Sequence, residues 1–240
     1  NITGNSSAGV YNVGTFTMTG GSITASTPSS VGVYAKTASN TNVNGGTVTV
    51  SGGSTALYSE TGATIRLLNP TVINVNDKSL MFYRSGTGAL SGTATGNINN
   101  GGTAFYITGG NTPTISSLVT SGNILLNMGT NSTLVEWDQP TGTLSLSALT
   151  GVLGTPNIAN TTVNDLSSGT YRYFIINKSN ASIDKDTELS GTGSQYLPRV
   201  SFISSSIQIE NGFTVTGTEV SQIGIAQRNF SGSLGVGAIV

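Results

Sequence analysis

The chain has 240 residues, with 33 Gly, no Cys and no His, and nine basic against ten acidic residues give a formal net charge of −1. Only 8% of the residues are charged, against about 25% in a typical globular protein. The missing Cys and His exclude disulfides, zinc-thiolate sites, a cysteine nucleophile and a Ser–His–Asp triad within the chain. The near-neutral charge argues against a nucleic-acid partner. No apolar run reaches the ~18 residues of a transmembrane helix, so we expect no membrane insertion of this segment.

The chain begins inside a polar, repetitive stretch, without an initiator Met or a signal peptide. We therefore interpret it as a segment of a longer, processed polypeptide. A repeat without evident caps leaves strand edges open, so we also expect end-to-end self-association.

One short unit recurs along the first half of the chain: a small or apolar residue, a large apolar residue and Tyr. Its copies are Gly9-Val10-Tyr11, Gly32-Val33-Tyr34, Ala56-Leu57-Tyr58, Met81-Phe82-Tyr83 and Ala104-Phe105-Tyr106. The tyrosines recur at a nearly constant interval, and Leu125-Leu126-Asn127 follows at a slightly shorter interval as an expected sixth copy. A fixed period of about 24 residues indicates a structural repeat.

Each period contains two or three short runs in which polar and apolar residues alternate. The runs Thr15–Thr19 and Ser22–Thr24 flank Gly20-Gly21, and Thr47–Val50 is followed by Ser51-Gly52-Gly53. Alternation with a period of two predicts strands, and the glycine pairs predict turns. No stretch has the periodicity of an amphipathic helix of ordinary length.

Short strands in every period, without helices, predict an all-β fold, a single-stranded parallel β-helix (solenoid) with about 24 residues per coil. Strands of successive coils would pair about 4.8 Å apart, so that equivalent residues stack. We expect an apolar core column of Val10, Val33, Leu57, Phe82 and Phe105, and Asn and Thr ladders at the turns. A propeller needs about 40–45 residues per blade, and the leucine-rich-repeat pattern is absent.

We expect one domain over residues 1–240, with regular coils in 1–130 and less regular coils in 131–240. The first 125 residues carry six charges and the rest carry thirteen, while strand-like runs continue throughout. The polar segment near 177–191 is interpreted as a loop that projects from the rod, or as one irregular coil.

The S-x-G-V-Y unit is clearest in Ser6–Tyr11 and Ser29–Lys36, and it is accompanied by Asn-Gly-Gly turns at 44–46 and 100–102. In this pattern the chain resembles the passenger region of Gram-negative type V autotransporters, most of all the repetitive fusobacterial-type outer-membrane adhesins. The likeness covers about the first 125 residues well and the rest by composition. It implies a right-handed β-helix that is exported through the outer membrane to the cell surface.

The candidate ligand-binding residues are aromatic: Tyr11, Tyr34, Tyr58, Tyr83, Tyr106 and the single Trp, Trp137. A large apolar residue precedes each tyrosine and should face the core, which places the tyrosine on the opposite face. Two residues before each tyrosine the side chain is small in four of five copies, so we expect the rings to lie over these positions. An outward aromatic strip suits contact with sugars or with a partner protein. The alternative is that the rings stack on each other purely as structure.

Two acidic clusters are weaker candidates for chemistry. Glu136 and Asp138 share one strand face beside Trp137, as a glycosidase carboxylate pair would, but no further carboxylates accompany them. The run Asp184–Glu188 has the first spacings of a calcium loop, without that loop's later Gly and acidic positions. We expect no catalytic residue, no metal site and no cofactor.

The sequence therefore predicts a binding protein and not an enzyme. We expect an extracellular adhesin segment that contacts a host or bacterial cell-surface glycan or protein and serves as a rigid stalk. Two alternatives are open: a purely structural stalk whose binding site lies elsewhere, and a polysaccharide lyase or hydrolase of the β-helix type.

Overall fold

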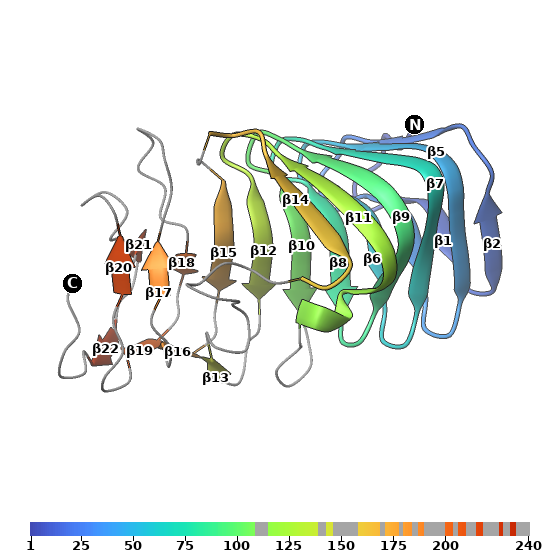
Figure 1. The fold of residues 1–240 in the computed structure, drawn as a ribbon. Helices are drawn as coiled ribbons and strands as arrows, with labels where there is room; N and C mark the ends of the chain where they lie inside the picture. The colour runs from blue at the N-terminus through green and yellow to red at the C-terminus, as the bar shows by residue number, and fades with distance from the viewer. Residues whose placement is uncertain are drawn as a thin grey trace.

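The structure, a computed structural model, describes residues 1–108, 115–138, 143–145, 158–168 and 171–177. It also describes the strand segments 180–183, 187–189, 200–203, 206–209, 215–217, 226–227 and 231–233. Over these residues the fold is all-β, with one short 3-10 helix, η1 (Ile115–Ser117) (Figure 1). No helix in the described part of the chain is long and apolar enough to cross a membrane.

Two large parallel sheets contain most of the strands. The first, with nine strands, has the spatial order β1 (Ala8–Asn12), β4 (Val31–Ala35), β6 (Thr55–Ser59), β8 (Leu80–Ser85), β10 (Thr103–Thr108), β12 (Thr133–Asp138), β15 (Arg172–Asn177), β18 (Val200–Ile203) and β21 (Ala226–Gln227). The second, with seven strands, has the order β14 (Thr161–Asp165), β11 (Val119–Met128), β9 (Ala89–Ile98), β7 (Thr64–Val75), β5 (Asn40–Val50) and β2 (Thr15–Met18), and β3 (Ser22–Ala25) also pairs with β5.

The chain alternates between these sheets from β4 to β12, so each repeat gives one strand to each sheet. Strands one repeat apart then pair in parallel and lie side by side along the molecule (Figure 1). The expectation of an all-β repeat with parallel pairing is confirmed at this level. The long strands β5, β7, β9 and β11 replace the two shorter runs that the alternation predicts in each period.

The predicted sixth copy of the tyrosine unit is wrong. Leu125-Leu126-Asn127 lies on β11 of the seven-stranded sheet, where Asn127 pairs with Asn97. The strand that follows β10 in the nine-stranded sheet is β12, and Tyr106 pairs there with Glu136. The reason is an insertion, because the chain between Tyr106 and Glu136 is longer than the chain between any two successive tyrosines of the repeat.

The core lies between the inner faces of the two sheets. The predicted column is buried from Val33 onward, and Leu57, Phe82 and Phe105 are inaccessible to solvent. Val135 and Phe174 extend it along β12 and β15. Burial of each such side chain contributes about 1.5–3 kcal/mol. Phe82 and Phe105 pack edge to face, with ring centroids 6.4 Å apart.

The turns that enter the nine-stranded sheet repeat one conformation. In three successive repeats both central residues have positive φ: Gly52 and Gly53, Asp77 and Lys78, and Asn100 and Gly101. Each turn is closed by a backbone hydrogen bond, such as that from the Gly102 N–H to the Asn99 carbonyl at 2.9 Å. The predicted turn at Asn100–Gly102 is confirmed. By contrast, Asn44-Gly45-Gly46 lies inside β5, as a bulge within a continuous strand.

Bulges in the long strands place glycines against the backbone of the preceding repeat. Gly92 has φ +94°, and a Cβ there would collide with the Leu67 carbonyl oxygen. Gly122 on β11 pairs with Gly92 on β9, and its Cβ would collide with the Gly92 carbonyl oxygen. Only glycine fits this close approach.

Beyond residue 138 the nine-stranded sheet continues through β15, β18 and β21. The remaining short strands form two small parallel sheets. The first contains β13 (Thr143–Ser145), β16 (Asn180–Ile183), β19 (Ser206–Ile209) and β22 (Ser231–Ser233), and the second contains β17 (Thr187–Leu189) and β20 (Val215–Gly217). Two of these strands, β16 and β17, fall within 177–191. The other residues of 178–191 lie outside the described part of the chain, and the choice between a projecting loop and an irregular coil stays a prediction.

Gly92→Ala should lower the midpoint of urea-induced unfolding more than Gly53→Ala does. Gly53 also has positive φ, but nothing lies within 4 Å of its Cβ position. Gly53→Ala therefore measures only the conformational cost of placing a Cβ at positive φ, about 1–2 kcal/mol. Gly92→Ala adds a backbone clash to that cost. Equal midpoints for the two variants would contradict the close stacking of the bulges.

Candidate functional site: a tyrosine column

The five repeat tyrosines form one column on the outer face of the nine-stranded sheet. Parallel register pairs each with the next, from Tyr11 on β1 to Tyr106 on β10. Successive ring centroids are 5.0, 4.3, 4.5 and 4.9 Å apart, and the central rings are closest to parallel. The preceding residues face the core, as predicted. We call Tyr11, Tyr34, Tyr58, Tyr83 and Tyr106 the tyrosine column.

The small residues two positions before the tyrosines do not lie under the rings, and that expectation is wrong. Ala56, Met81 and Ala104 have no exposed surface. A Cβ at Gly32 would lie 3.0 Å from Val48 Cγ1 on the opposite sheet, so this position also faces inward. Two consecutive residues therefore turn into the core before Tyr34, Tyr58, Tyr83 and Tyr106, and the strict alternation of these strands begins only after them.

Stacking determines which part of each ring meets solvent. The rings from Tyr34 to Tyr106 are half-buried, whereas Tyr11 is 56% exposed. Because the ring faces lie against each other, the column presents ring edges and hydroxyl groups outward. Hydroxyl contacts suit this surface better than the stacking of a sugar on a ring face.

Three of the hydroxyl groups have side-chain partners in the next repeat. The Tyr34 hydroxyl donates to Glu60 Oε1 at 2.6 Å, and the Tyr106 hydroxyl donates to Asp138 Oδ2 at 2.5 Å. Thr108 Oγ1 donates to the Tyr83 hydroxyl at 3.1 Å. Burial first, and then these carboxylate partners, raise the pKa of Tyr34 and of Tyr106. Both phenols therefore stay protonated donors at neutral pH.

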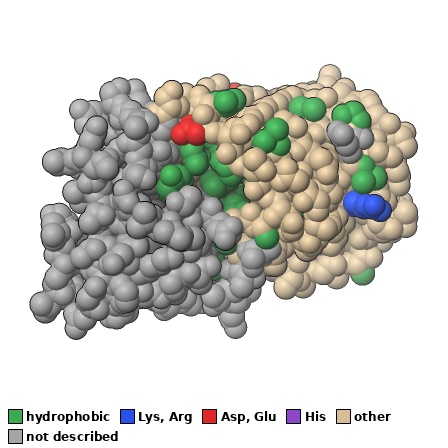
Figure 2. Space-filling view, in the orientation of Figure 1, with side chains coloured by type: hydrophobic (Ala, Val, Ile, Leu, Met, Phe, Trp, Pro, Cys, Tyr) green, Lys and Arg blue, Asp and Glu red, His purple; other side chains and the backbone are tan. Residues whose placement is uncertain are grey.

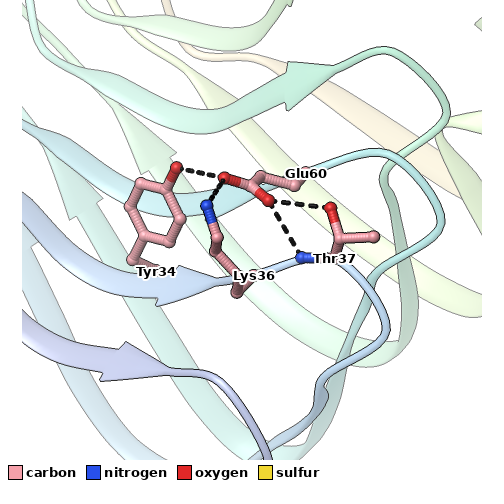
Figure 3. Close-up of polar contacts among 4 residues, drawn as sticks. All are labelled: Tyr34, Lys36, Thr37 and Glu60. Atoms are coloured by element: carbon pink, nitrogen blue, oxygen red, sulfur yellow. Dashed lines mark hydrogen bonds and ion pairs between the residues drawn. The ribbon is translucent and has the colours of Figure 1, made fainter.

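Glu60 is the centre of a charged cluster beside the column (Figure 3). Its Oε1 accepts from the Tyr34 hydroxyl and, at 3.0 Å, from Lys36 Nζ. Its Oε2 accepts from the Thr37 backbone N–H at 3.0 Å and from Thr37 Oγ1 at 2.8 Å. The bond from Tyr34, followed by that from the Thr37 backbone, lowers the pKa of Glu60 to about 2. The Glu60 carboxylate thus bonds its own repeat to the bend of the preceding repeat that contains Lys36 and Thr37.

Trp137 does not belong to the exposed surface. Its side chain is 2% exposed and is part of the core, so the proposed ligand contact through Trp137 is not supported. Strand alternation explains this position, because Glu136 pairs with Tyr106 on the outer face and the next residue must point inward. Glu136 and Asp138 share the outer face as predicted, and Asp138 accepts the bond from Tyr106.

No group of three or more acidic, His or Cys residues able to hold a metal occurs among the described residues. Most of the Asp184–Glu188 run lies outside them.

The buried charge of Arg84 was not anticipated from the sequence. Its side chain is 4% exposed, and burial lowers its pKa. The Nε group donates to the Gly86 carbonyl and Nη1 donates to Ser117 Oγ, both at 2.9 Å. Arg84 therefore ties the corner after β8 to η1, and its role is structural.

The seven-stranded sheet carries an asparagine ladder, a feature that the sequence predicts without its residues or its place. It consists of Asn74, Asn97, Asn127 and Asn164, which are in register on β7, β9, β11 and β14. The hydrogen-bonded ladder agrees with expectation, but it lies within strands and not at turns. Its members are unevenly spaced along the chain, and this irregularity hides the ladder in the sequence.

Comparisons with models of protein families, with curated proteins and with solved structures give no match for this chain.

Glu60→Gln should lower the free energy of unfolding at neutral pH by about 1.5–3 kcal/mol, the range for hydrogen bonds to a charged group. The fold lowers the Glu60 pKa from its ordinary 4.5 to about 2. The carboxylate therefore stabilises the fold above pH 4.5, and this contribution disappears as the pH falls towards 2. Urea unfolding across this pH range should show the gap between wild type and variant closing.

Thr37→Val is the matched control, because it removes one bond to Glu60 but keeps the carboxylate and its other partners. It should lower stability while retaining the wild-type loss towards low pH. A Glu60→Gln gap that stays constant from neutral pH to pH 2 would exclude the cluster as a source of pH dependence.

Proposed function

We propose that this chain is a segment of an extracellular adhesin, the passenger of a Gram-negative autotransporter, which binds a glycan or protein on a host or bacterial cell surface through the tyrosine column. The observation that carries the proposal is the column itself: five rings in register on an outer face, three of whose hydroxyl groups bond to side chains of the next repeat. The resemblance in the repeat unit supports the family and the cell-surface location.

The fold that we propose for the segment is a single-stranded, right-handed parallel β-helix in which each repeat forms one coil. In support, equivalent residues of successive repeats pair in parallel, and the chain returns to each sheet once per repeat. A rod built this way is stiff, because every coil is bonded to both neighbours along two sheets. Such a rod can serve as a stalk that holds the column away from the cell.

Recognition by this surface would depend on hydroxyl groups and ring edges, with few charges. Tyrosine contributes rigid contact area at low entropic cost, which makes it a common interface residue. Beside the column Lys36 forms an ion pair with Glu60, and Asp138 accepts the hydrogen bond from Tyr106. We therefore expect binding that depends weakly on salt concentration.

A purely structural stalk is the second candidate, and one observation favours it. The rings already contact each other, and Tyr34, Tyr83 and Tyr106 already have hydroxyl partners within the chain. Stacking contributes about 0.5–1.5 kcal/mol per pair, enough to maintain the column without a ligand. The lyase or hydrolase alternative depends on Glu136 and Asp138, and the use of Asp138 as acceptor for Tyr106 does not support it.

The test is a binding screen of the purified chain over a glycan array and intact host cells. The triple variant Tyr34→Ser/Tyr58→Ser/Tyr83→Ser removes the rings and should abolish binding. The triple Phe variant at the same positions keeps the stack and should weaken binding by removing the hydroxyl groups. Circular dichroism establishes that both variants keep the wild-type fold.

Absence of wild-type binding across the screen would contradict the adhesin proposal for this segment and favour the stalk. Binding that the folded Ser variant retains would exclude the tyrosine column as the contact surface.

A further inference from the structure

The outer face of the seven-stranded sheet carries the asparagine ladder, and its side chains form one continuous chain of amide hydrogen bonds. Asn97 Nδ2 donates to Asn74 Oδ1 at 2.9 Å, Asn127 Nδ2 to Asn97 Oδ1 at 2.8 Å, and Asn164 Nδ2 to Asn127 Oδ1 at 3.2 Å. All three bonds run in the same direction. The amides are thereby held in one repeated orientation across four strands.

This chain of bonds uses only half of the bonding capacity of each inner amide. A carboxamide has two N–H donors and two acceptor lone pairs. Asn97 and Asn127 each donate once and accept once within the ladder. Both are half-buried on the outer face, so one donor and one acceptor per strand remain for a ligand or water. Strand pairing repeats this pair of groups about every 4.8 Å.

A second column runs beside the ladder, two residues before it on each strand. It consists of Val72, Thr95, Leu125 and Thr162, which are paired in register. Val72, Thr95 and Leu125 are half-buried and Thr162 is exposed. Methyl and methylene groups of this column therefore lie next to the amides over the same four strands. The two columns together make an uncharged strip with one polar and one apolar side.

The lack of charge and the residue types of the strip indicate which class of ligand it suits. Neither column contains a charge, which disfavours nucleic acids and other polyanions. Neither contains the Trp, Tyr or Arg anchors typical of protein interfaces. In the view where β14 and β11 face the reader, the described residues show few Lys, Arg, Asp or Glu side chains (Figure 2). Sugars combine apolar C–H faces with hydroxyl groups that both donate and accept, which matches the two columns.

We propose that this strip binds an extended neutral polysaccharide that lies across β7, β9, β11 and β14, parallel to the ladder. Its hydroxyl groups exchange hydrogen bonds with the free donor and acceptor of each amide, and its C–H faces lie against the neighbouring column. The site is on a different sheet from the tyrosine column and does not depend on the function proposed for that column.

The experiment is cosedimentation of the full chain with insoluble cellulose, chitin, mannan and amylose, with immobilised polygalacturonate as an anionic probe. The wild type should bind at least one neutral polysaccharide, with little effect of salt. Asn97→Leu/Asn127→Leu removes the inner amides at similar side-chain volume and should weaken that binding by about tenfold or more. Leu125→Lys keeps the ladder but places a charge beside it, and it should weaken binding similarly.

Asn42→Leu is the matched control, because Asn42 is a half-buried residue on β5 outside both columns. It should bind as the wild type does, and so should the Ser variant of the tyrosine column. Circular dichroism and thermal melting establish that each variant is folded. Lack of binding to all four neutral polysaccharides, or binding only to polygalacturonate, would overturn the proposal. So would equal binding by the folded ladder variants, or loss of binding in the tyrosine variant alone.

Discussion

Parallel backbone pairing between strands one repeat apart is the interaction on which the rest of the structure depends. It places equivalent residues of successive repeats about 4.8 Å from each other. A residue type that recurs at the right position therefore becomes a continuous column, whether of buried Phe and Leu, stacked Tyr or bonded Asn. Each column then reinforces the register that created it, because a slip by one residue would exchange the two faces of the strand.

The same constraint explains where glycine is required. Bulges in the long strands must stack as well, and each brings the backbone of one repeat close to that of the next. At Gly92 and Gly122 no Cβ fits between them. At the turns the requirement is only for positive φ, and Asp77, Lys78 and Asn100 satisfy it there. The abundance of glycine thus has two separate causes, close approach within strands and backbone conformation at turns.

The few charged side chains Glu60 and Arg84 form hydrogen bonds between segments that are far apart in the sequence. Glu60 joins the corner that contains Lys36 and Thr37, and Arg84 joins its own corner to η1. What remains exposed on the two sheets is largely neutral: hydroxyl-bearing rings on one face, and amides beside methyl groups on the other. The two surfaces that we propose for recognition lie on different sheets, so binding at one leaves the other accessible.

The sequence by itself determined the repeat, the strands, the inward apolar column, the outward tyrosines and the turn at Asn100–Gly102. These follow from alternation and turn chemistry, which are local properties of the chain. Only the tertiary structure decided that Asn127 joins the other sheet, that Trp137 is buried, and that Ala56 and Met81 face inward beside their apolar neighbours. It also decided that Glu60 meets Tyr34, which belongs to the preceding repeat. These outcomes depend on the number of residues in each bend between strands, because that number decides which residues of neighbouring strands lie opposite each other. Bend length has no periodic pattern in the sequence, so it could not be predicted from the sequence.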